Sequence, residues 1–468
     1  MRMRIHFLGI GGYAVSGLAL VAKSLGDDVT GSDEDAYPPT TEILTNAKIP
    51  WVNRHDPKNL TKWPRPDLVV QGNQVRADNP EAAAAREMGL RIVSEAEYWG
   101  ELTRDRTRIV VAGSHGKTTT AGLIAWILKM AGRNPGFRLG ATVRDLGGAA
   151  DWGGGREFVF EGDEYTSASF DPRPKFLHFA PNIAVLLNVD WDHPDVFPDP
   201  AAYELAFRQL VESLGPEDRL FACHDDAGVR RLLSRTRASV ETYGLKGGAD
   251  WQGRDVQTET NGMRFTAWHG GKVIAVVETQ LAGAHNAANA LAALATTVRL
   301  GVPVATALQG IVRFQGAGRR FEIRGRARQV TVIDDYAHHP SEVRATLRAA
   351  QERFGPGRVL ALFVPHTFSR TLSLLDGYAD AFAGCALTLI GPIEPARERH
   401  LAHTVSAEDL ARQVRDGGEV GTVASARDAA TRLATAARPG DAIVCMSVRG
   451  FDDVAAKTLR ALQGSAVG

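Results

Sequence analysis

The chain has 468 residues, which at one domain per roughly 150 residues predicts about three domains and excludes a single small binding module. Lys+Arg and Asp+Glu both number 54, and no basic stripe interleaved with aromatic residues favours a nucleic-acid or membrane-surface partner. The three cysteines form no Cys-x-x-Cys pair, the apolar runs are too short to cross a membrane, and Met1 to Arg4 lead into a short strand rather than a signal peptide, so we expect a cytoplasmic protein.

The N-terminal part alternates short apolar runs with helical patterns. Ile5–Leu8 is followed by a glycine turn and a helix, and further strands are expected at Val29–Asp33, Leu68–Val70 and Arg91–Val93. Strands that alternate with helices predict a doubly wound parallel sheet, and we expect this Rossmann-like domain to span residues 1–107.

The glycine turn of this domain has the pattern of a dinucleotide fingerprint. Gly9-x-Gly11-x-x-Ala14 lies between strand and helix, and Asp33 ends the next strand about 20 residues further on. Gly11 and Gly12 would let the backbone approach a diphosphate, and Asp33 would hold a ribose hydroxyl. NAD, another diphosphate nucleotide and a bare tight turn all remain open from these residues.

A second α/β domain, expected over residues 108–316, begins with the strand Ile109–Ala112. That strand runs into a phosphate-binding loop and a helix, with the sequence Gly113-Ser114-His115-Gly116-Lys117-Thr118-Thr119. The backbone amides would cradle phosphates, Lys117 would reach the β- and γ-phosphates, and Thr118 would ligate Mg2+. Val111 stands where the usual motif has its first glycine, and a plain Gly/Lys turn is the alternative.

Polar residues follow two later strands of this domain. Glu161-Gly162-Asp163-Glu164 comes after Glu157–Phe160, and Asn188–His193 comes after Ile183–Leu187. Ligands bind at the carboxyl ends of strands in open α/β sheets, and carboxylate oxygens suit Mg2+. Either segment alone is commonly a surface loop, but together beside a phosphate-binding loop they favour a metal site that includes Glu161 and His193.

The end of the second domain changes texture. Ser239–Thr279 has short alternating runs and turns at Asn261-Gly262 and Gly270-Gly271, which predicts a small antiparallel insertion. A helix is expected over Asn286–Leu300, where Asn286 would either cap the helix or contact an adenine edge.

A third α/β domain is expected over residues 317–468, after the linker Gln315–Arg320. Its expected strands are Val330–Ile333, Val359–Phe363, Ala386–Ile390 and Ala442–Met446. Arg320 is either a solvated linker charge or a phosphate clamp at a domain junction. The polar cluster Asp334–Pro340 ends a buried strand, and this position favours a functional site.

These motifs occur in the order seen in the Mur ligases, and the resemblance covers essentially the whole chain. The motifs are the phosphate-binding loop, Glu161–Glu164, Asn188–His193, His285-Asn286-x-x-Asn289, Arg319–Glu322 and Asp334–Glu342. The resemblance implies an ADP-forming ligase of peptidoglycan synthesis or recycling, with ATP and Mg2+. It also implies a Rossmann-like UDP-binding domain, a P-loop ATPase-like central domain with a small antiparallel insertion, and a Rossmann-like C-terminal domain for an amino acid or short peptide.

The resemblance also assigns roles to individual residues. The glycine turn would bind UDP rather than NAD, and the lactyl carboxylate of UDP-N-acetylmuramate would attack the γ-phosphate of ATP to give an acyl phosphate. We expect nucleotide and metal contacts from Gly113, Ser114, His115, Gly116, Lys117, Thr118, Thr119, Glu161, His193, Asn286, Arg320 and Asp334. His338 and His339 would lie near the reacting phosphate or acceptor, and Arg370 would contact substrate.

Two members of the family act on UDP-N-acetylmuramate itself, and the chain carries features of both. Tyr37-Pro38-Pro39 and Phe170-Asp171-x-Arg173-x-Lys175-Phe176 resemble the member that adds an L-alanyl-γ-D-glutamyl-diaminopimelate-type tripeptide. Pro365-His366-Thr367-Phe368-Ser369-Arg370-Thr371 resembles the member that adds L-alanine. The sequence favours the tripeptide, with L-alanine as the alternative.

Three other functions account for fewer of these motifs. A nicotinamide oxidoreductase would leave the phosphate-binding loop without a role, and a non-catalytic nucleotide sensor would not need Lys117, Glu161 and His193 together. Folate polyglutamylation by a related ligase does not account for the additional N-terminal nucleotide-type domain.

Overall fold

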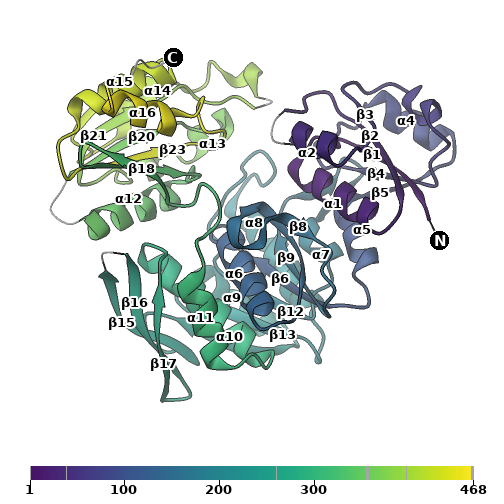
Figure 1. Cartoon of the computed structure of the whole chain (residues 1–468), viewed down its shortest axis with the longest axis horizontal. Helices are drawn as coiled ribbons and strands as arrows, with labels where there is room; N and C mark the ends of the chain where they lie inside the picture. The colour runs from purple at the N-terminus through teal and green to yellow at the C-terminus, as the bar shows by residue number, and fades with distance from the viewer. Residues whose placement is uncertain (1, 38–39, 260, 355–357, 397, 465–468) are drawn as a thin grey trace. The chain divides into compact units, whose positions relative to one another are not determined.

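The computed structural model describes residues 2–37, 40–259, 261–354, 358–396 and 398–464 (Figure 1). Pro38 and Pro39 of the Tyr37–Pro39 motif, and the outermost residues of the expected first and third domains, lie outside these ranges. The described chain forms two compact units. Unit 1 comprises residues 1–190, 201–243 and 292–310, and unit 2 comprises residues 191–200, 244–291 and 311–468.

Unit 1 begins with a five-stranded parallel sheet in the order β3-β2-β1-β4-β5. Its strands are β1 (Arg4–Leu8), β2 (Asp28–Ser32), β3 (Trp51–Val52), β4 (Leu68–Gln71) and β5 (Arg91–Ser94), and its helices are α1 (Tyr13–Ser24), α2 (Thr40–Asn46), α3 (Asn59–Lys62), α4 (Pro80–Glu87) and α5 (Glu95–Leu102). Phe7, Val69 and Val70 are fully buried between the helices. The predicted parallel sheet is therefore confirmed, and β3 is an addition.

The second sheet of unit 1 has the strand order β14-β13-β12-β6-β9-β7-β8, parallel except for the edge strand β8. Its strands are β6 (Thr107–Ala112), β7 (Gly136–Val143), β8 (Gly148–Asp151), β9 (Glu157–Gly162), β12 (Ile183–Leu186), β13 (Arg219–Cys223) and β14 (Ser239–Gly244). A separate hairpin pairs β10 (Thr166–Ala168) with β11 (Asp171–Pro174).

Helices flank this sheet. The helices are α6 (Lys117–Met130), α7 (Lys175–His178), α8 (Pro200–Ser213), α9 (Ala227–Leu232), α10 (Ala284–Arg299) and α11 (Val304–Arg313).

One expectation about strand β14 is wrong. Ser239–Gly244 was expected in the antiparallel insertion, but it pairs in parallel with β13. Tyr243 in β14 is buried, as residues in the other strands of the parallel sheet are. The antiparallel insertion therefore begins only at Trp251.

Unit 2 contains the insertion and the C-terminal sheet. The insertion is an antiparallel meander of β15 (Trp251–Glu259), β16 (Gly262–His269) and β17 (Lys272–Thr279). The six-stranded sheet has the order β18-β19-β23-β20-β21-β22, with β18 antiparallel. Its elements are β18 (Glu322–Ala327), β19 (Val330–Asp335), α12 (Pro340–Phe354), β20 (Val359–Phe363), α13 (Phe368–Ser373), β21 (Cys385–Ile390), α14 (Ala407–Gln413), β22 (Glu419–Thr422), α15 (Ala426–Ala436), β23 (Ala442–Met446) and α16 (Val454–Leu462).

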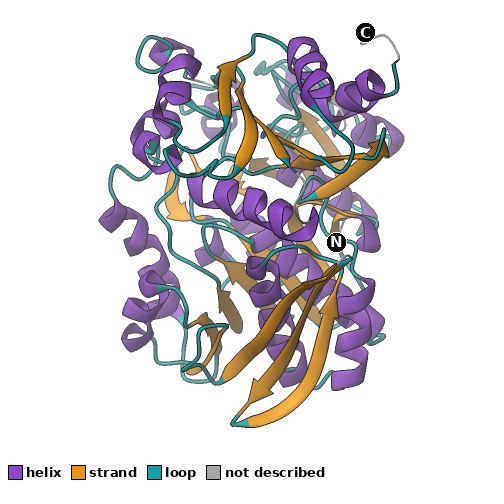
Figure 2. Ribbon diagram, turned by 90° about the vertical axis from the view of Figure 1, so that its left-hand side faces the viewer, coloured by secondary structure: helices purple, strands orange, loops and turns teal. Residues whose placement is uncertain are grey.

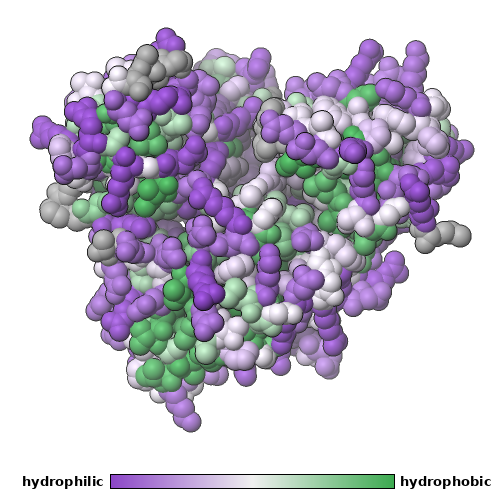
Figure 3. Space-filling view, in the orientation of Figure 1, coloured by the Kyte–Doolittle hydropathy of each residue, from purple (hydrophilic) through white to green (hydrophobic). Residues whose placement is uncertain are grey.

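Helices flank the strands of each α/β sheet (Figure 2), as their apolar faces require. Hydrophilic side chains cover most of the surface seen in Figure 3, and hydrophobic ones gather near the meander, where Val273 and Val276 are exposed. Among the described helices, none has the length and apolar composition needed to span a bilayer.

Candidate functional site

The glycine turn of the N-terminal sheet is closed by the acid that the sequence pairs with it. The Gly11 N–H donates to Asp33 Oδ2 at 2.8 Å, and Asp33 Oδ1 accepts from the N–H groups of Glu34 and Asp35 at 2.8 and 2.9 Å. A Cβ on Gly11 would lie 2.5 Å from Ala36 Cβ, so only glycine fits. Gly12 is the N-cap of α1 without a capping side chain. The helix N-terminus is thus open toward an anionic group.

The phosphate-binding loop joins β6 to α6 at the carboxyl end of the second sheet. Gly113 and Gly116 have φ angles of 144° and 82°, which L side chains adopt only under strain. A Cβ on Gly113 would also lie 3.0 Å from the backbone nitrogen of Asn188. The loop then enters α6 at Lys117, so its N–H groups lie at a helix N-terminus, where phosphate binds favourably.

The Lys117 side chain is fixed by hydrogen bonds to the phosphate-binding loop and to Glu164. Its Nζ donates to the carbonyl oxygens of Gly113 at 2.6 Å and Ser114 at 3.3 Å, and to Glu164 Oε2 at 2.9 Å. Burial works against the charge, but Glu164 and the neighbouring acids outweigh it and raise the pKa of the Lys117 ammonium. Lys117 is therefore a fixed cation at the position where phosphate oxygens would bind.

Thr118 and Glu161 form the part of the site that suits a divalent cation. Thr118 Oγ1 donates to Glu161 Oε1 at 2.9 Å, and Glu161 Oε2 accepts from the Gly140 N–H at 2.6 Å. Both residues are buried, and desolvation together with the charge of Asp163 raises the pKa of Glu161. A buried hydroxyl and a buried carboxylate are the hard oxygen donors that Mg2+ prefers, and a cation would relieve the cost of ionising Glu161.

A second set of contacts fixes the backbone of the loop from the neighbouring strand end. Asn188 Oδ1 accepts from the His115 N–H at 2.8 Å, and Asn188 Nδ2 donates to the His115 carbonyl at 3.1 Å. Ser114 Oγ accepts from the Asp190 N–H at 2.8 Å and from the Tyr203 hydroxyl at 2.9 Å. His115 Nε2 lies 3.1 Å from Asp190 Oδ2. The Asn188–Asp190 segment therefore positions the loop.

In unit 2, Arg370 organises a second cluster of charged residues. Its Nε donates to Asp192 Oδ1 at 2.6 Å, Nη1 to the His366 carbonyl at 2.9 Å and Nη2 to His193 Nδ1 at 3.2 Å. Although burial opposes ionisation, Arg370 and His193 hold the pKa of Asp192 well below its usual range. Arg370, which was expected to contact substrate, thus directs these three donors toward protein atoms.

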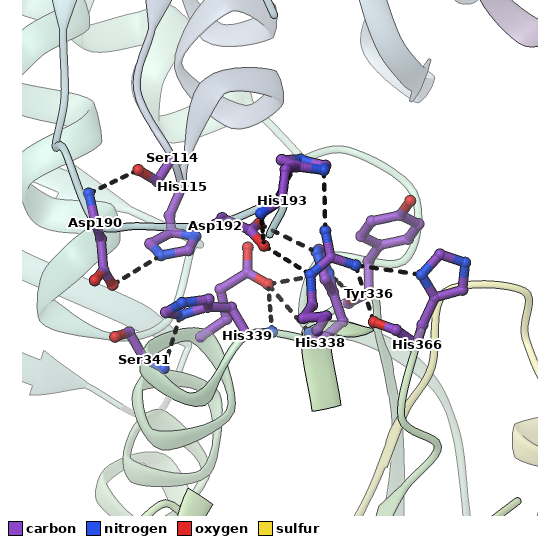
Figure 4. Close-up of polar contacts among 12 residues, drawn as sticks. Ser114, His115, Asp190, Asp192, His193, Tyr336, His338, His339, Ser341 and His366 are labelled. Atoms are coloured by element: carbon purple, nitrogen blue, oxygen red, sulfur yellow. Dashed lines mark hydrogen bonds and ion pairs between the residues drawn. The ribbon is translucent and has the colours of Figure 1, made fainter. Parts of the chain in front are cut away.

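Histidines from three segments lie around this ion pair, namely His193, His338 with His339, and His366 (Figure 4). His338 Nε2 lies 3.8 Å from Asp192 Oδ2, and His338 Nδ1 lies 3.2 Å from Glu342 Oε2. His339 Nε2 lies 3.1 Å from the Trp191 carbonyl. Burial and the nearby Arg370 lower the pKa of His366 to about 3, so its imidazole is neutral at physiological pH. The cluster is polar, lies where β19 and β20 end, and contains the carboxylates of Asp192 and Glu342 as well as Arg370.

The remaining predicted nucleotide contacts also lie in unit 2. Asn286 donates from Nδ2 to the Ala282 carbonyl at 2.8 Å, and α10 begins at Ala284, so Asn286 is not the N-cap residue. The Arg320 guanidinium lies 4.8 Å from the Tyr336 ring centroid and 3.5 Å from Glu342 Oε1, so it is not a solvated linker charge. Asp334 pairs with Arg319 at 3.2 Å, and burial raises the pKa of the Asp334 carboxyl.

The predicted site residues therefore fall into groups within each unit. Gly113–Thr119 and Glu161 meet in unit 1, and His193, His338 and Arg370 meet in unit 2. The sequence reasoning missed Tyr203 on α8, which carries no motif, and it assigned no role to Asn188, Asp192 or Glu164, although each stands in a segment that it singled out. A metal shell that includes both Glu161 and His193 stays a prediction.

A strand, a phosphate-binding loop with a buried lysine, and a carboxylate against the loop threonine define a P-loop α/β enzyme that uses a nucleoside triphosphate. Family models describe the same residues: "Mur ligase family, catalytic domain" matches residues 4–107, "Mur ligase middle domain" residues 111–297, and "Mur ligase, glutamate ligase domain" residues 319–449. The chain belongs to the Mur ligase family, the ATP-dependent ligases that form amide bonds.

Individual relatives agree with this assignment. The chain is 37% identical to the UDP-N-acetylmuramate–L-alanine ligase of Roseiflexus sp., with 95% of this chain and 96% of the relative covered. It is 34% identical to the UDP-N-acetylmuramate–L-alanyl-γ-D-glutamyl-meso-2,6-diaminoheptandioate ligase of Escherichia coli, with 98% of each covered. Among solved structures, murein peptide ligase from Psychrobacter arcticus has a TM-score of 0.74 at 30% identity, with 99% of each chain covered. UDP-N-acetylmuramate-alanine ligase from Thermotoga maritima has a TM-score of 0.81 at 26% identity, with 99% of this chain and 100% of that chain covered.

Proposed function

We propose that this protein joins the lactyl carboxylate of UDP-N-acetylmuramate to the amino group of an acceptor, with conversion of ATP to ADP and phosphate. The observation that carries the proposal is the phosphate-binding loop in which Lys117 and Thr118 are held by Glu164 and Glu161. The relatives named above support UDP-N-acetylmuramate as the substrate, and the open glycine turn at Gly11 and Gly12 is our candidate for its diphosphate.

The reaction has two steps. A lactyl carboxylate oxygen attacks the γ-phosphorus of ATP, the bond to the β-phosphate oxygen breaks, and ADP leaves. The acceptor amine then attacks the carbonyl carbon of the acyl phosphate, loses a proton and expels phosphate. Phosphoryl transfer depends on charge neutralisation and in-line positioning, which Lys117 and the loop N–H groups provide. Mg2+ held by Thr118 and Glu161 would add further neutralisation of the phosphate charge.

We infer further roles for residues of unit 2. Asn286 contacts the adenine, Asp334 the ribose and Arg320 a phosphate, while His338 and His339 stand near the reacting phosphate or acceptor. Arg370 orients His193 and His366 through its hydrogen bonds, which keeps these three side chains together. Exclusion of water by these side chains matters because an acyl phosphate hydrolyses readily.

For the acceptor we propose L-alanine. The Arg370 cluster belongs to the Pro365–Thr371 loop, which resembles the L-alanine-adding member, and the relative at 37% identity has that name. In the segment that resembles the tripeptide-adding member, Lys175 is buried beside Glu95 and Asp163, whereas Arg173 pairs with Asp171 at 2.8 Å and stays largely exposed.

The tripeptide remains the second candidate because the Escherichia coli relative is named for that acceptor and the Psychrobacter arcticus structure is named a murein peptide ligase. The test is ATP-dependent phosphate release with UDP-N-acetylmuramate and either L-alanine or the tripeptide, each at equal concentration, with a control that lacks acceptor. We expect a higher kcat/KM with L-alanine. A higher kcat/KM with the tripeptide would assign the chain to peptide recycling instead.

A further inference from the structure

A buried cluster of four charged side chains lies beside the Glu161–Glu164 loop. Its members are Arg138 on β7, Lys175 at the start of α7, Glu95 at the start of α5, and Asp163. Their exposed fractions are 2%, 3%, 1% and 6%. Two cations balance two anions, which is the condition under which buried charges are tolerated.

Arg138 is the member of the cluster that contacts the backbone of Glu161, the carboxylate proposed to bind the metal. Its Nη1 donates both to the Glu161 carbonyl at 3.1 Å and to Asp163 Oδ2 at 3.0 Å. From the opposite side, Nε and Nη2 donate to the two carboxylate oxygens of Glu95 at 3.2 and 3.4 Å. Arg138 thus spans the turn at Gly162 and joins it to the first residue of α5.

Lys175 neutralises the same acids in a different way. Its Nζ lies 3.5 Å from Glu95 Oε2 and 3.7 Å from Asp163 Oδ2, and 4.9 Å from the Tyr165 ring centroid. An ammonium is a point charge, whereas a guanidinium presents donors in a fixed plane. Lys175 therefore supplies charge balance, and Arg138 supplies charge balance together with a fixed geometry.

The geometry matters because the residues of the loop alternate in direction. The Glu161 side chain reaches Thr118 and the Gly140 N–H, while the Glu161 carbonyl and the Asp163 side chain face Arg138. The backbone at Gly162 packs closely on β6, because a Cβ there would lie 2.6 Å from Val110 Cγ1. A hydrogen bond to the Glu161 carbonyl therefore restricts the direction of the Glu161 carboxylate.

We propose that Arg138 is a positioning residue for Glu161, and that through Glu95 it ties the divalent-cation site to helix α5 of the N-terminal sheet. The inference rests on the proposed function, in which Glu161 binds the metal that accompanies the nucleotide. A purely structural role, in which Arg138 only balances buried charge, makes a different prediction.

Two charge-neutral double variants separate these roles. Glu95→Gln with Arg138→Met leaves the Asp163–Lys175 pair, and Glu95→Gln with Lys175→Met leaves the Asp163–Arg138 pair. Each variant removes one cation and one anion, so buried charge is balanced equally in both. Thermal unfolding measured for each protein serves as the control for the fold.

The readout is the affinity for Mn2+ in the presence of ADP. Binding is measured as the loss of the paramagnetic resonance signal of free Mn2+. We expect the Arg138 variant to bind Mn2+ about 10- to 100-fold more weakly than the wild type, as is usual when a residue that orients a ligand is removed. The Lys175 variant is expected to bind within about threefold of the wild type, because its Arg138 still holds the Glu161 carbonyl.

Equal Mn2+ affinities for the two double variants would overturn the inference and leave charge balance as the role of Arg138. If the Arg138 double variant does not fold, the single variant Arg138→Lys takes its place, since it keeps the charge balance of the cluster and removes the planar donor set, and the same weakening is expected. A wild type that binds ADP but takes up no Mn2+ would instead overturn the metal site of the proposed function, and this inference with it.

Discussion

Replacement of Lys117 by methionine separates the two tasks that this side chain performs. Its Nζ is paired with Glu164 at 2.9 Å inside the protein, where the exposed fraction of the two side chains is 11% and 1%. The same ammonium faces the position proposed for the ATP phosphates. Lys117→Met therefore leaves a buried carboxylate without its cation and removes the positive charge from the nucleotide site.

The two losses affect different measured quantities and have different remedies. Breaking a buried ion pair by removing one partner costs about 3–5 kcal/mol of the free energy of unfolding. Neutralising the remaining acid with Glu164→Gln removes most of that cost, because Gln needs no counter-charge and still accepts the hydrogen bond from Tyr203. The lost phosphate contact is expected to lower kcat by roughly 10³-fold or more, and Glu164→Gln cannot restore it.

The assay measures both quantities on the wild type, Lys117→Met, Glu164→Gln and the double variant. Unfolding in urea is followed by circular dichroism, and ADP formation is followed with saturating substrates. We expect the double variant to recover most of the stability and none of the activity. A Lys117→Met variant as stable as the wild type would refute the buried ion pair, and recovery of kcat in the double variant would refute the phosphate contact.

Other substitutions test single contacts. Thr118→Val keeps the volume of the side chain but removes its hydroxyl, so the Mg2+ concentration for half-maximal activity should rise at least tenfold, and an unchanged Mg2+ dependence would contradict its role. Tyr203→Phe removes the hydrogen bond to Ser114 and should cost about 1 kcal/mol, seen as a several-fold higher KM for ATP in steady-state kinetics with unchanged KM values for the other substrates. Asp192→Asn leaves Arg370 without its carboxylate. Because the native pKa of Asp192 is lowered, its contribution to the free energy of unfolding is present above the unfolded pKa of about 4 and declines as the pH falls further, so the deficit of this variant in urea unfolding should shrink below pH 4.

The sequence predicted the α/β architecture well because both α/β sheets of the N-terminal and central regions have short, strongly apolar strands. Ile109–Ala112 and Ile183–Leu186 are buried on both faces, as parallel strands between helices must be. The two-residue strand β3 and the edge strands β18 and β22 were missed, because they are short or half-exposed and carry little apolar signal. Strands β7 and β13 were also missed, although residues 220–223 of β13 are buried.

The site was predictable where one motif supplies both the residue and its surroundings. Gly113–Thr119 and Glu161 meet because each follows a strand of the same parallel sheet, and parallel strands place their carboxyl ends at one edge. Partners contributed by distant segments were not predictable. Tyr203 reaches Ser114 from a helix 89 residues away, and Arg370 reaches Asp192 across 178 residues.

The partners of individual charged residues were also not predictable from the sequence. Arg173 and Lys175 belong to the segment that resembles the tripeptide-adding member, and in the fold Arg173 pairs with Asp171 while Lys175 pairs with Glu95 and Asp163. Spacing along the chain shows that charges occur together, but it does not show which of them pair within the protein.

The central claim is that ATP activates the lactyl carboxylate of UDP-N-acetylmuramate by phosphorylation. The most direct measurement uses UDP-N-acetylmuramate labelled with heavy oxygen in that carboxylate, together with ATP and L-alanine, and analyses the released phosphate by mass spectrometry. The account predicts one labelled oxygen in each phosphate molecule, formed in equal amounts with ADP and the amide product. Phosphate without label would contradict it.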